Sequence, residues 1–230
     1  MPTPTPTATG TAPPVPRGLL RVSGAAGVVA GTLIVTSQLV ELTLGLTATN
    51  LATEILTVPA TLSLLTKLLG FVLLPLALVG AYLHEAAQVG RSGLIGLLAA
   101  TTGAVLTAGD WWFEAFGVTW LARSAPEVLS LPPSTAMAVA AHTGFGLLAV
   151  GAVLLGLASV RARVFPRWTA ALLAVGGVPA LIGGSSPFLL LLGCAVAVIG
   201  WCVLRGGPRV GPGAADQRLR AGAAPGPATT

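Results

Sequence analysis

Charged residues are nearly absent from long apolar stretches of this chain, and no other feature constrains its fold as much. Only 8% of the 230 residues are charged, 54% are hydrophobic, and the mean hydropathy is +0.88. A globular protein in water could not expose so apolar a surface. Each stretch is close to the ~20 residues that cross the hydrocarbon core of a bilayer as a helix. The stretches are 22–42, 62–84, 93–113, 135–159, 168–183 and 188–204.

This pattern predicts an all-α polytopic membrane protein, with six transmembrane helices in one bundle that covers residues 20–205. The last two stretches are short and share only the turn 184–187, so we expect them to form a tight helical hairpin. Residues 1–19 and 206–230 are rich in Pro, Thr, Gly and Ala and show no apolar period. They should form two disordered tails.

The basic residues give an orientation, because all but two of the 12 fall in alternate connections. By the positive-inside rule, this side and both termini are cytoplasmic. Lys67 and Arg123 are the exceptions. The high isoelectric point, about 10.6, needs no nucleic acid as a partner, since inner-face arginines also meet anionic lipid head groups. The residues of the basic side are Arg17, Arg21, Arg91, Arg161, Arg163, Arg167, Arg205, Arg209, Arg218 and Arg220.

Six polar residues of the apolar stretches fall at a similar depth, near the outer surface, when a rise of about 1.5 Å per residue is applied. A charge at mid-bilayer costs at least ~2.5 kcal/mol on insertion scales, so such residues need an explanation. By contrast, His84, Glu85 and Arg91 mark the inner edge and have the character of ordinary interfacial residues. The outer layer consists of Gln38, Glu41, Lys67, Asp110, Glu114 and His142.

A structural interpretation of this layer is that Lys67 neutralises a carboxylate of the third stretch. Asp110 is the expected partner and Glu114 the alternative, because the two share a helix face at i and i+4. His142 would form a hydrogen bond nearby. An outer aromatic belt would be supplied by Trp111, Trp112, Phe113 and Trp120.

A functional interpretation is that Glu41, Lys67, Asp110, Glu114 and His142 line a pocket open to the outside. Such a pocket would bind a small polar ligand, a proton or a metal ion. A metal ion would have to use His142 with one or two of the carboxylates, which are too few soft ligands to name the ion. We therefore assign no metal site.

No motif for catalysis or for a cofactor is present. The chain has no Gly-x-Ser-x-Gly, no His-Glu-x-x-His and no phosphate-binding glycine loop. His84 and His142 differ in membrane depth by ~20 Å, so they cannot hold one haem between them. Cys194 and Cys202 are ~12 Å apart along one helix and cannot form a disulfide, which leaves them as small packing residues.

Small residues recur at every fourth position of two stretches, and such stripes allow close approach of helices in lipid. We expect them to pack within one chain, with a homo-oligomer as the alternative. Pro75 and Pro179 each lie in the middle helix of a three-helix half, a pattern compatible with inverted 3+3 repeats of the transporter type. The stripes are Ser23, Gly27 and Gly31 in the first stretch, and Gly96, Ala100, Ala104 and Ala108 in the third.

Two segments resemble uncharacterised bacterial multi-pass membrane proteins that form a domain-of-unknown-function group. One is GDWWFEAF at 109–116, which continues to WLA at 120–122 and AP at 125–126. The other is RARVFPRW at 161–168, followed by ALL at 171–173 and GG at 176–177. The resemblance implies a six-helix bundle of bacterial origin and no particular activity. A single lysine among the basic residues, with much Ala and Gly, is likewise typical of high-GC bacteria such as actinobacteria.

The sequence thus predicts an integral protein of the plasma membrane with no assigned activity. It is expected to be an accessory protein or to bind a small polar ligand or ion at the outer polar layer. The alternative is a small secondary transporter with inverted 3+3 helices.

Overall fold

The computed structural model describes residues 15–44, 55–132, 134–181 and 187–206. Within these ranges the chain is helical and contains no strand, which confirms the all-α prediction. The predicted tails lie largely outside the described residues, as does 184–186 of the predicted turn. The first helix begins at Arg17, however, so the prediction that residues 17–19 belong to a disordered tail is wrong.

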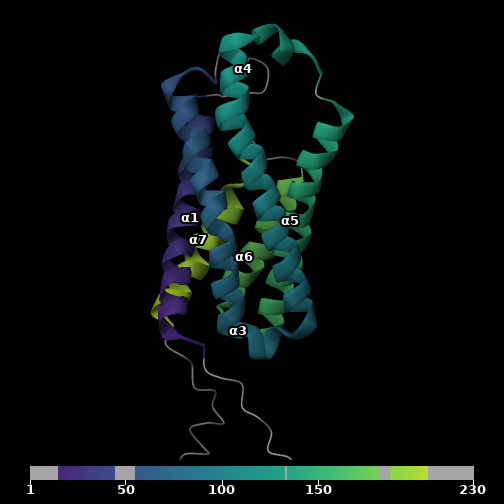
Figure 1. Ribbon diagram of the computed structural model, residues 1–230. Coiled ribbons are helices and arrows are strands. Elements are labelled where there is room, and N and C mark those ends of the chain that lie inside the picture. Colours follow the sequence, from purple (N-terminus) through teal and green to yellow (C-terminus); the bar gives the residue numbers. More distant parts are fainter. Residues whose placement is uncertain (1–14, 45–54, 133, 182–186, 207–230) are drawn as a thin grey trace, which may run out of the picture.

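The described residues form six α-helices, and all but the short α4 make up the body of the molecule (Figure 1). Three helical segments are long and apolar enough to cross a membrane: α1, the run from Val58 to Ser124, and α5. Two further apolar helices, Arg167–Leu181 and Leu190–Arg205, are shorter. The elements in order are α1 (Arg17–Leu44), α3 (Val58–Trp112), the π-helix η2 (Phe113–Val118), α4 (Thr119–Ser124), the 3-10 helix η3 (Pro126–Ser130), α5 (Thr135–Ala162), α6 (Arg167–Gly177), the 3-10 helix η4 (Val178–Leu181) and α7 (Leu190–Arg205).

A sharp bend at Gly90 divides α3 into a first arm, 58–89, and a second arm, 91–112. Gly90 has φ 59° and ψ −155°, a backbone region that is essentially restricted to glycine. Figure 1 shows that the chain reverses direction at this bend. The two predicted stretches 62–84 and 93–113 are therefore the arms of one helical hairpin.

Small residues bring the helices into close contact. A Cβ atom added to Gly27 of α1 would lie 2.8 Å from Gly200 of α7, and one added to Gly151 of α5 would lie 2.1 Å from the backbone N of Ala100 in the second arm. Gly80 of the first arm meets Ser23 of α1 in the same way. Both predicted stripes thus pack against helices of the same chain, so a homo-oligomer would need a different surface.

The ends of the molecule differ in charge. At one end, called the basic end here, lie the start of α1, the bend of α3, the turn between α5 and α6, and the end of α7 (Figure 1). The opposite end, called the acidic end, holds most of the described carboxylates, with Lys67 and Arg123 as its basic residues. The basic end carries Arg17, Arg21, Arg91, Arg161, Arg163, Arg167 and Arg205, and the acidic end carries Glu41, Asp110, Glu114 and Glu127.

Candidate functional site

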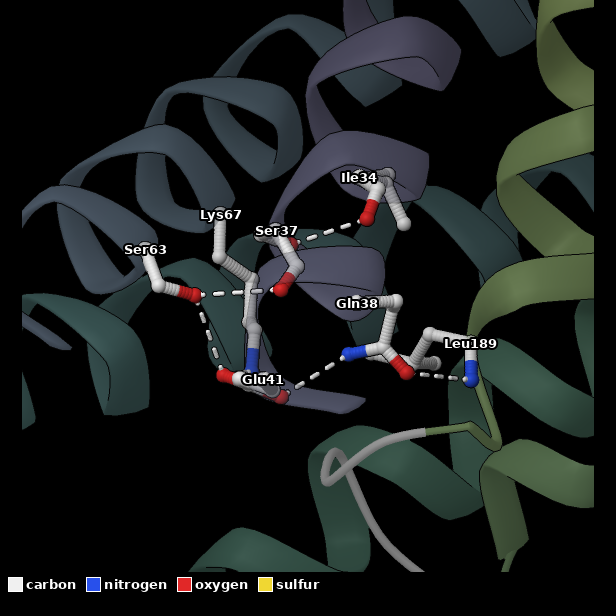
Figure 2. A network of polar contacts seen from close by, with 7 residues as sticks. All are labelled: Ile34, Ser37, Gln38, Glu41, Ser63, Lys67 and Leu189. Carbon is white, nitrogen blue, oxygen red and sulfur yellow. Dashed lines mark hydrogen bonds and ion pairs between the residues drawn. The ribbon is translucent and has the colours of Figure 1, made fainter. Parts of the chain in front are cut away.

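A buried ion pair joins α1 to the first arm of α3 near the acidic end. The ammonium of Lys67 contacts Oε1 of Glu41, as Figure 2 shows. The side chain of Lys67 is 1% exposed and that of Glu41 is 11% exposed. Two opposite charges are thus held together between helices that are otherwise apolar, where an unpaired charge would be costly.

Other polar groups complete the hydrogen bonds of the Glu41 carboxylate. The hydroxyl of Ser63 lies 3.3 Å from Oε1 of Glu41 and 3.2 Å from the carbonyl oxygen of Ser37, so its single proton is shared between two acceptors. The amide of Gln38 donates to Oε2 of Glu41 at 3.3 Å. Both carboxylate oxygens therefore accept hydrogen bonds, which fixes the position of Glu41.

The same network reaches α7 through Gln38. Its side-chain oxygen accepts a hydrogen bond of 3.2 Å from the backbone N–H of Leu189, the residue that precedes α7 (Figure 2). Gln38 is 1% exposed, so this contact is shielded from solvent. The polar cluster, defined here as Ser37, Gln38, Glu41, Ser63 and Lys67, connects three helices and is a built feature of the fold.

Trp111 of the second arm covers the ammonium of Lys67. The Nζ atom lies 4.0 Å from the centre of the Trp111 ring, within the range of a cation–π interaction. Phe71 and Phe145 pack on the same indole, with ring centres 6.4 and 6.1 Å away. Trp111 is buried, so its predicted place in an outer aromatic belt is wrong. Trp112 and Trp120 are exposed and remain candidates for such a belt.

The prediction that Lys67 pairs with Asp110 is also wrong. Glu41 of α1 forms the ion pair, and Asp110 does not contact Lys67. The reason is that the first arm packs directly on α1, where Gly70 allows close approach to Ile34. This brings the polar faces of these two helices together.

A further carboxylate, that of Glu114, lies beside the polar cluster. Glu114 interacts electrostatically with Lys67, Glu41 and Asp110. It belongs to the π-helix η2, and such local widening of a helix is frequent at functional sites. Lys67 thus has two carboxylates near it, its ion-pair partner Glu41 and the more distant Glu114.

Asp110 borders a separate cavity of 380 Å³ between the second arm, η2 and the start of α5. Its other walls are apolar and include Leu106, Phe113 and Met137. The cluster itself is closed, because Lys67 and Gln38 are buried. The polar residues of the layer therefore do not line one common pocket, as predicted. They are divided between the closed cluster and the cavity beside Asp110.

His142 does not join the other predicted site residues. Its side chain is exposed, and Nδ1 lies 2.7 Å from the carbonyl oxygen of Ala138 on the same helix. The cause is the course of α5, whose first residues are exposed or half-buried until Gly144, so this part of the helix stands apart from the bundle.

In the described part of the chain, no group of three or more His, Cys, Asp or Glu side chains could hold a metal ion. Neither Cys194 nor Cys202 is part of a disulfide in the described residues.

Glu85 is a further buried carboxylate, at the basic end. It is 1% exposed and accepts a hydrogen bond from the hydroxyl of Ser159 on α5, while its Oε2 has no partner within the described ranges. The prediction that Glu85 is an ordinary interfacial residue is therefore wrong. No feature of the sequence near Glu85 indicated its contact with Ser159, 74 residues away.

Ser37 and Ser63 belong to the site but were absent from the predicted layer. A signal for them does exist, because Ser37 lies four residues before Glu41 and Ser63 four residues before Lys67, which places each pair on one helix face.

No family model, curated protein or solved structure matches this chain. The functional argument therefore depends on the geometry of the site.

Proposed function

We propose that the chain crosses a bacterial plasma membrane six times, with the basic end and both termini in the cytoplasm. The proposed spans are α1, the two arms of α3, α5, α6 with η4, and α7. Each arm exceeds the ~20 residues that a helical crossing requires. The concentration of arginine at one end of the bundle supports the orientation, since positive charge is retained on the cytoplasmic side.

We infer that this membrane protein binds a small polar ligand or ion at the polar cluster, and that the ligand is cationic. The observation that carries the proposal is the buried Lys67–Glu41 pair with Glu114 near it, and with Asp110 next to Glu114. One ammonium lies near two carboxylates, Glu41 and Glu114, in an apolar bundle, and a third carboxylate, Asp110, lies next to Glu114. A bound cation or proton would balance the remaining charge, and intramembrane ionisable residues of this kind commonly mark ligand and proton sites.

Binding can be tested on the purified protein in detergent through its melting temperature. Na⁺, K⁺, Mg²⁺, Ca²⁺ and protons, the last varied through pH, are the probes. A cation that binds the folded state raises its stability by about 2.7 kcal/mol at 100 times Kd. We expect one of these probes to raise the melting temperature of the wild type and to have a smaller effect on Glu114→Gln.

Glu127→Gln is the matched control, because Glu127 is an exposed carboxylate of η3 at the same end. It should respond as the wild type does. Equal responses of wild type, Glu114→Gln and Glu127→Gln to every probe would contradict a cation site at the cluster and leave it a structural element.

Transport is the second candidate function, and the helix contacts favour it. The chain can be divided into two halves of three helices: α1 with the two arms of α3, and α5 with α6 and α7. The first helix of each half then packs on the third helix of the other half, that is, α1 on α7 and α5 on the second arm. Gly27 meets Gly200 in one such crossing and Gly151 meets Ala100 in the other. A symmetric exchange of this kind is expected for inverted 3+3 repeats.

Proteoliposomes distinguish transport from binding alone. Uptake of the cation that stabilises the wild type, driven by a gradient and reduced in Glu114→Gln, would identify a secondary transporter. Stabilisation without uptake would favour an accessory, ligand-binding protein.

A further inference from the structure

A second cavity, of 420 Å³, lies at the basic end of the molecule. Its walls come from the end of the first arm, the turn between α5 and α6, and the end of α7. They include His84, Phe165, Trp201 and Arg205. This cavity is at the opposite end from the polar cluster, and the proposed cation site does not use it.

The cavity is cationic and partly aromatic. The guanidinium of Arg205 lies 4.1 Å from the centre of the Trp201 ring, so the indole covers one face of the guanidinium, and Arg205 is a wall residue of the cavity. The ring of His84 stacks on Phe165, with 5.5 Å between their centres. No acidic residue is among the described residues that line the cavity, and Arg205 forms no ion pair within the described ranges.

Further arginines surround the turn that forms one wall. Arg161 and Arg163 precede the wall residues of this turn, and Arg167 follows them. Arg163 has φ 57°, and its backbone N–H caps the end of α5 by bonding the carbonyl oxygen of Ser159. All three side chains are exposed. They raise the positive potential at this end of the molecule, which attracts anions.

We propose that this cavity binds a phosphate group through Arg205. A guanidinium donates two parallel hydrogen bonds to phosphate oxygens and is well suited to this recognition. The apolar surfaces of Phe165 and Trp201 would contact the carbon-bearing part of the molecule to which the phosphate belongs. In the topology proposed above, on which this step rests, the helix ends around the cavity lie where anionic lipid head groups gather at the cytoplasmic membrane surface. The head group of an anionic phospholipid and a soluble phosphate ion are the two sources of this chemistry.

Native mass spectrometry of the purified full-length protein tests the proposal. The probes are phosphatidylglycerol and phosphatidylcholine at equal concentration in mixed micelles, and inorganic phosphate in a separate titration. Wild type should retain a phosphate-bearing anion, either phosphatidylglycerol in preference to phosphatidylcholine or inorganic phosphate. Arg205→Gln should weaken this binding about tenfold, a ratio that corresponds to about 1.4 kcal/mol.

Arg91→Gln is the matched control, because it removes the same charge from the same end but lies at the exposed bend and not at the cavity. It should bind as the wild type does. If Arg205→Gln does not yield folded protein, Arg205→Lys replaces it, since the lysine retains the charge but not the planar fork, and a loss of about threefold is expected.

The titrations separate the two sources. Phosphatidylglycerol that is bound through Arg205 and not displaced by millimolar inorganic phosphate would identify a lipid site. Inorganic phosphate that binds through Arg205 and displaces the lipid would identify the soluble anion. Equal affinities of wild type, the Arg205 variant and Arg91→Gln, or no binding of either probe by the wild type, would overturn the proposal.

Discussion

Lys67 and Glu41 form an ion pair that connects α3 to α1, across 26 residues of sequence. Lys67 enters the pair from an apolar helix and is covered by Trp111, while Glu41 receives further hydrogen bonds from Ser63 and Gln38. The three donors that contact Glu41 are all buried; they are Gln38, Ser63 and Lys67. The pair therefore behaves as one unit, and removal of either partner leaves an uncompensated charge.

We expect Lys67→Met to lower the free energy of unfolding by about 3 kcal/mol, because it leaves Glu41 buried without its cation. Adding Glu41→Gln to this variant should restore part of the loss. The coupling in this double-mutant cycle can be measured by unfolding in mixed micelles. The cycle of Lys67→Met with Asp110→Asn is the control and should be closer to additive, since Asp110 does not contact Lys67. A larger coupling with Asp110 would contradict the observed pairing.

The crossing of α5 with the second arm of α3 should tolerate no side chain at Gly151. A Cβ there would lie 2.1 Å from the backbone N of Ala100, so Gly151→Ala must push two helices apart at a cost of about 1–3 kcal/mol. Gly146→Ala, in the same helix, meets no atom within 4 Å and should be neutral or slightly stabilising. Thermal unfolding of the two variants in detergent compares them directly. Similar melting temperatures for both would argue against this crossing.

Most of the fold could be predicted from the sequence because it depends on local composition. Apolar runs long enough to form helices and the positions of arginine identified the helices and the charge difference between the two ends. The bend at Gly90 was harder to predict, since the sequence shows a glycine and an arginine between two stretches but does not show that the two helices form one continuous hairpin. The last helices are also shorter than the earlier ones, as their sequence indicated.

The candidate site was predicted only in part because depth in a membrane does not specify direction around a helix axis. Depth alone placed Glu41, Lys67 and Glu114 in one layer, and they do lie together. It placed His142 there as well, although the start of α5 stands apart from the bundle. The choice of Glu41 as the partner of Lys67 depends on which helices are adjacent, and that is set by small residues such as Gly70.

The proposed topology predicts which surface sites a membrane-impermeant thiol reagent can reach on intact cells. Ser124 is exposed at the end of α4 and Ser92 is exposed beside the bend of α3, at opposite ends of the molecule (Figure 1). In a background that lacks Cys194 and Cys202, Ser124→Cys should be labelled on intact cells. Ser92→Cys should be labelled only after permeabilisation. The reverse pattern would place the basic end outside. A cysteine at Ser185 is predicted to behave as Ser124→Cys does, although Ser185 lies outside the described residues.

The bend of α3 should depend on the backbone freedom of Gly90 rather than on space around it. A Cβ at Gly90 would meet no atom within 4 Å, yet its φ of 59° with ψ of −155° is a conformation that other residues avoid. Gly90→Ala should therefore lower the free energy of unfolding by about 1–3 kcal/mol through backbone strain alone. Gly109→Ala, in the same helix and also without a neighbour within 4 Å, has no positive φ and should cause no loss. Unfolding measurements on both variants separate strain from crowding. A neutral Gly90→Ala would show that the chain reverses between the two arms through a different backbone conformation.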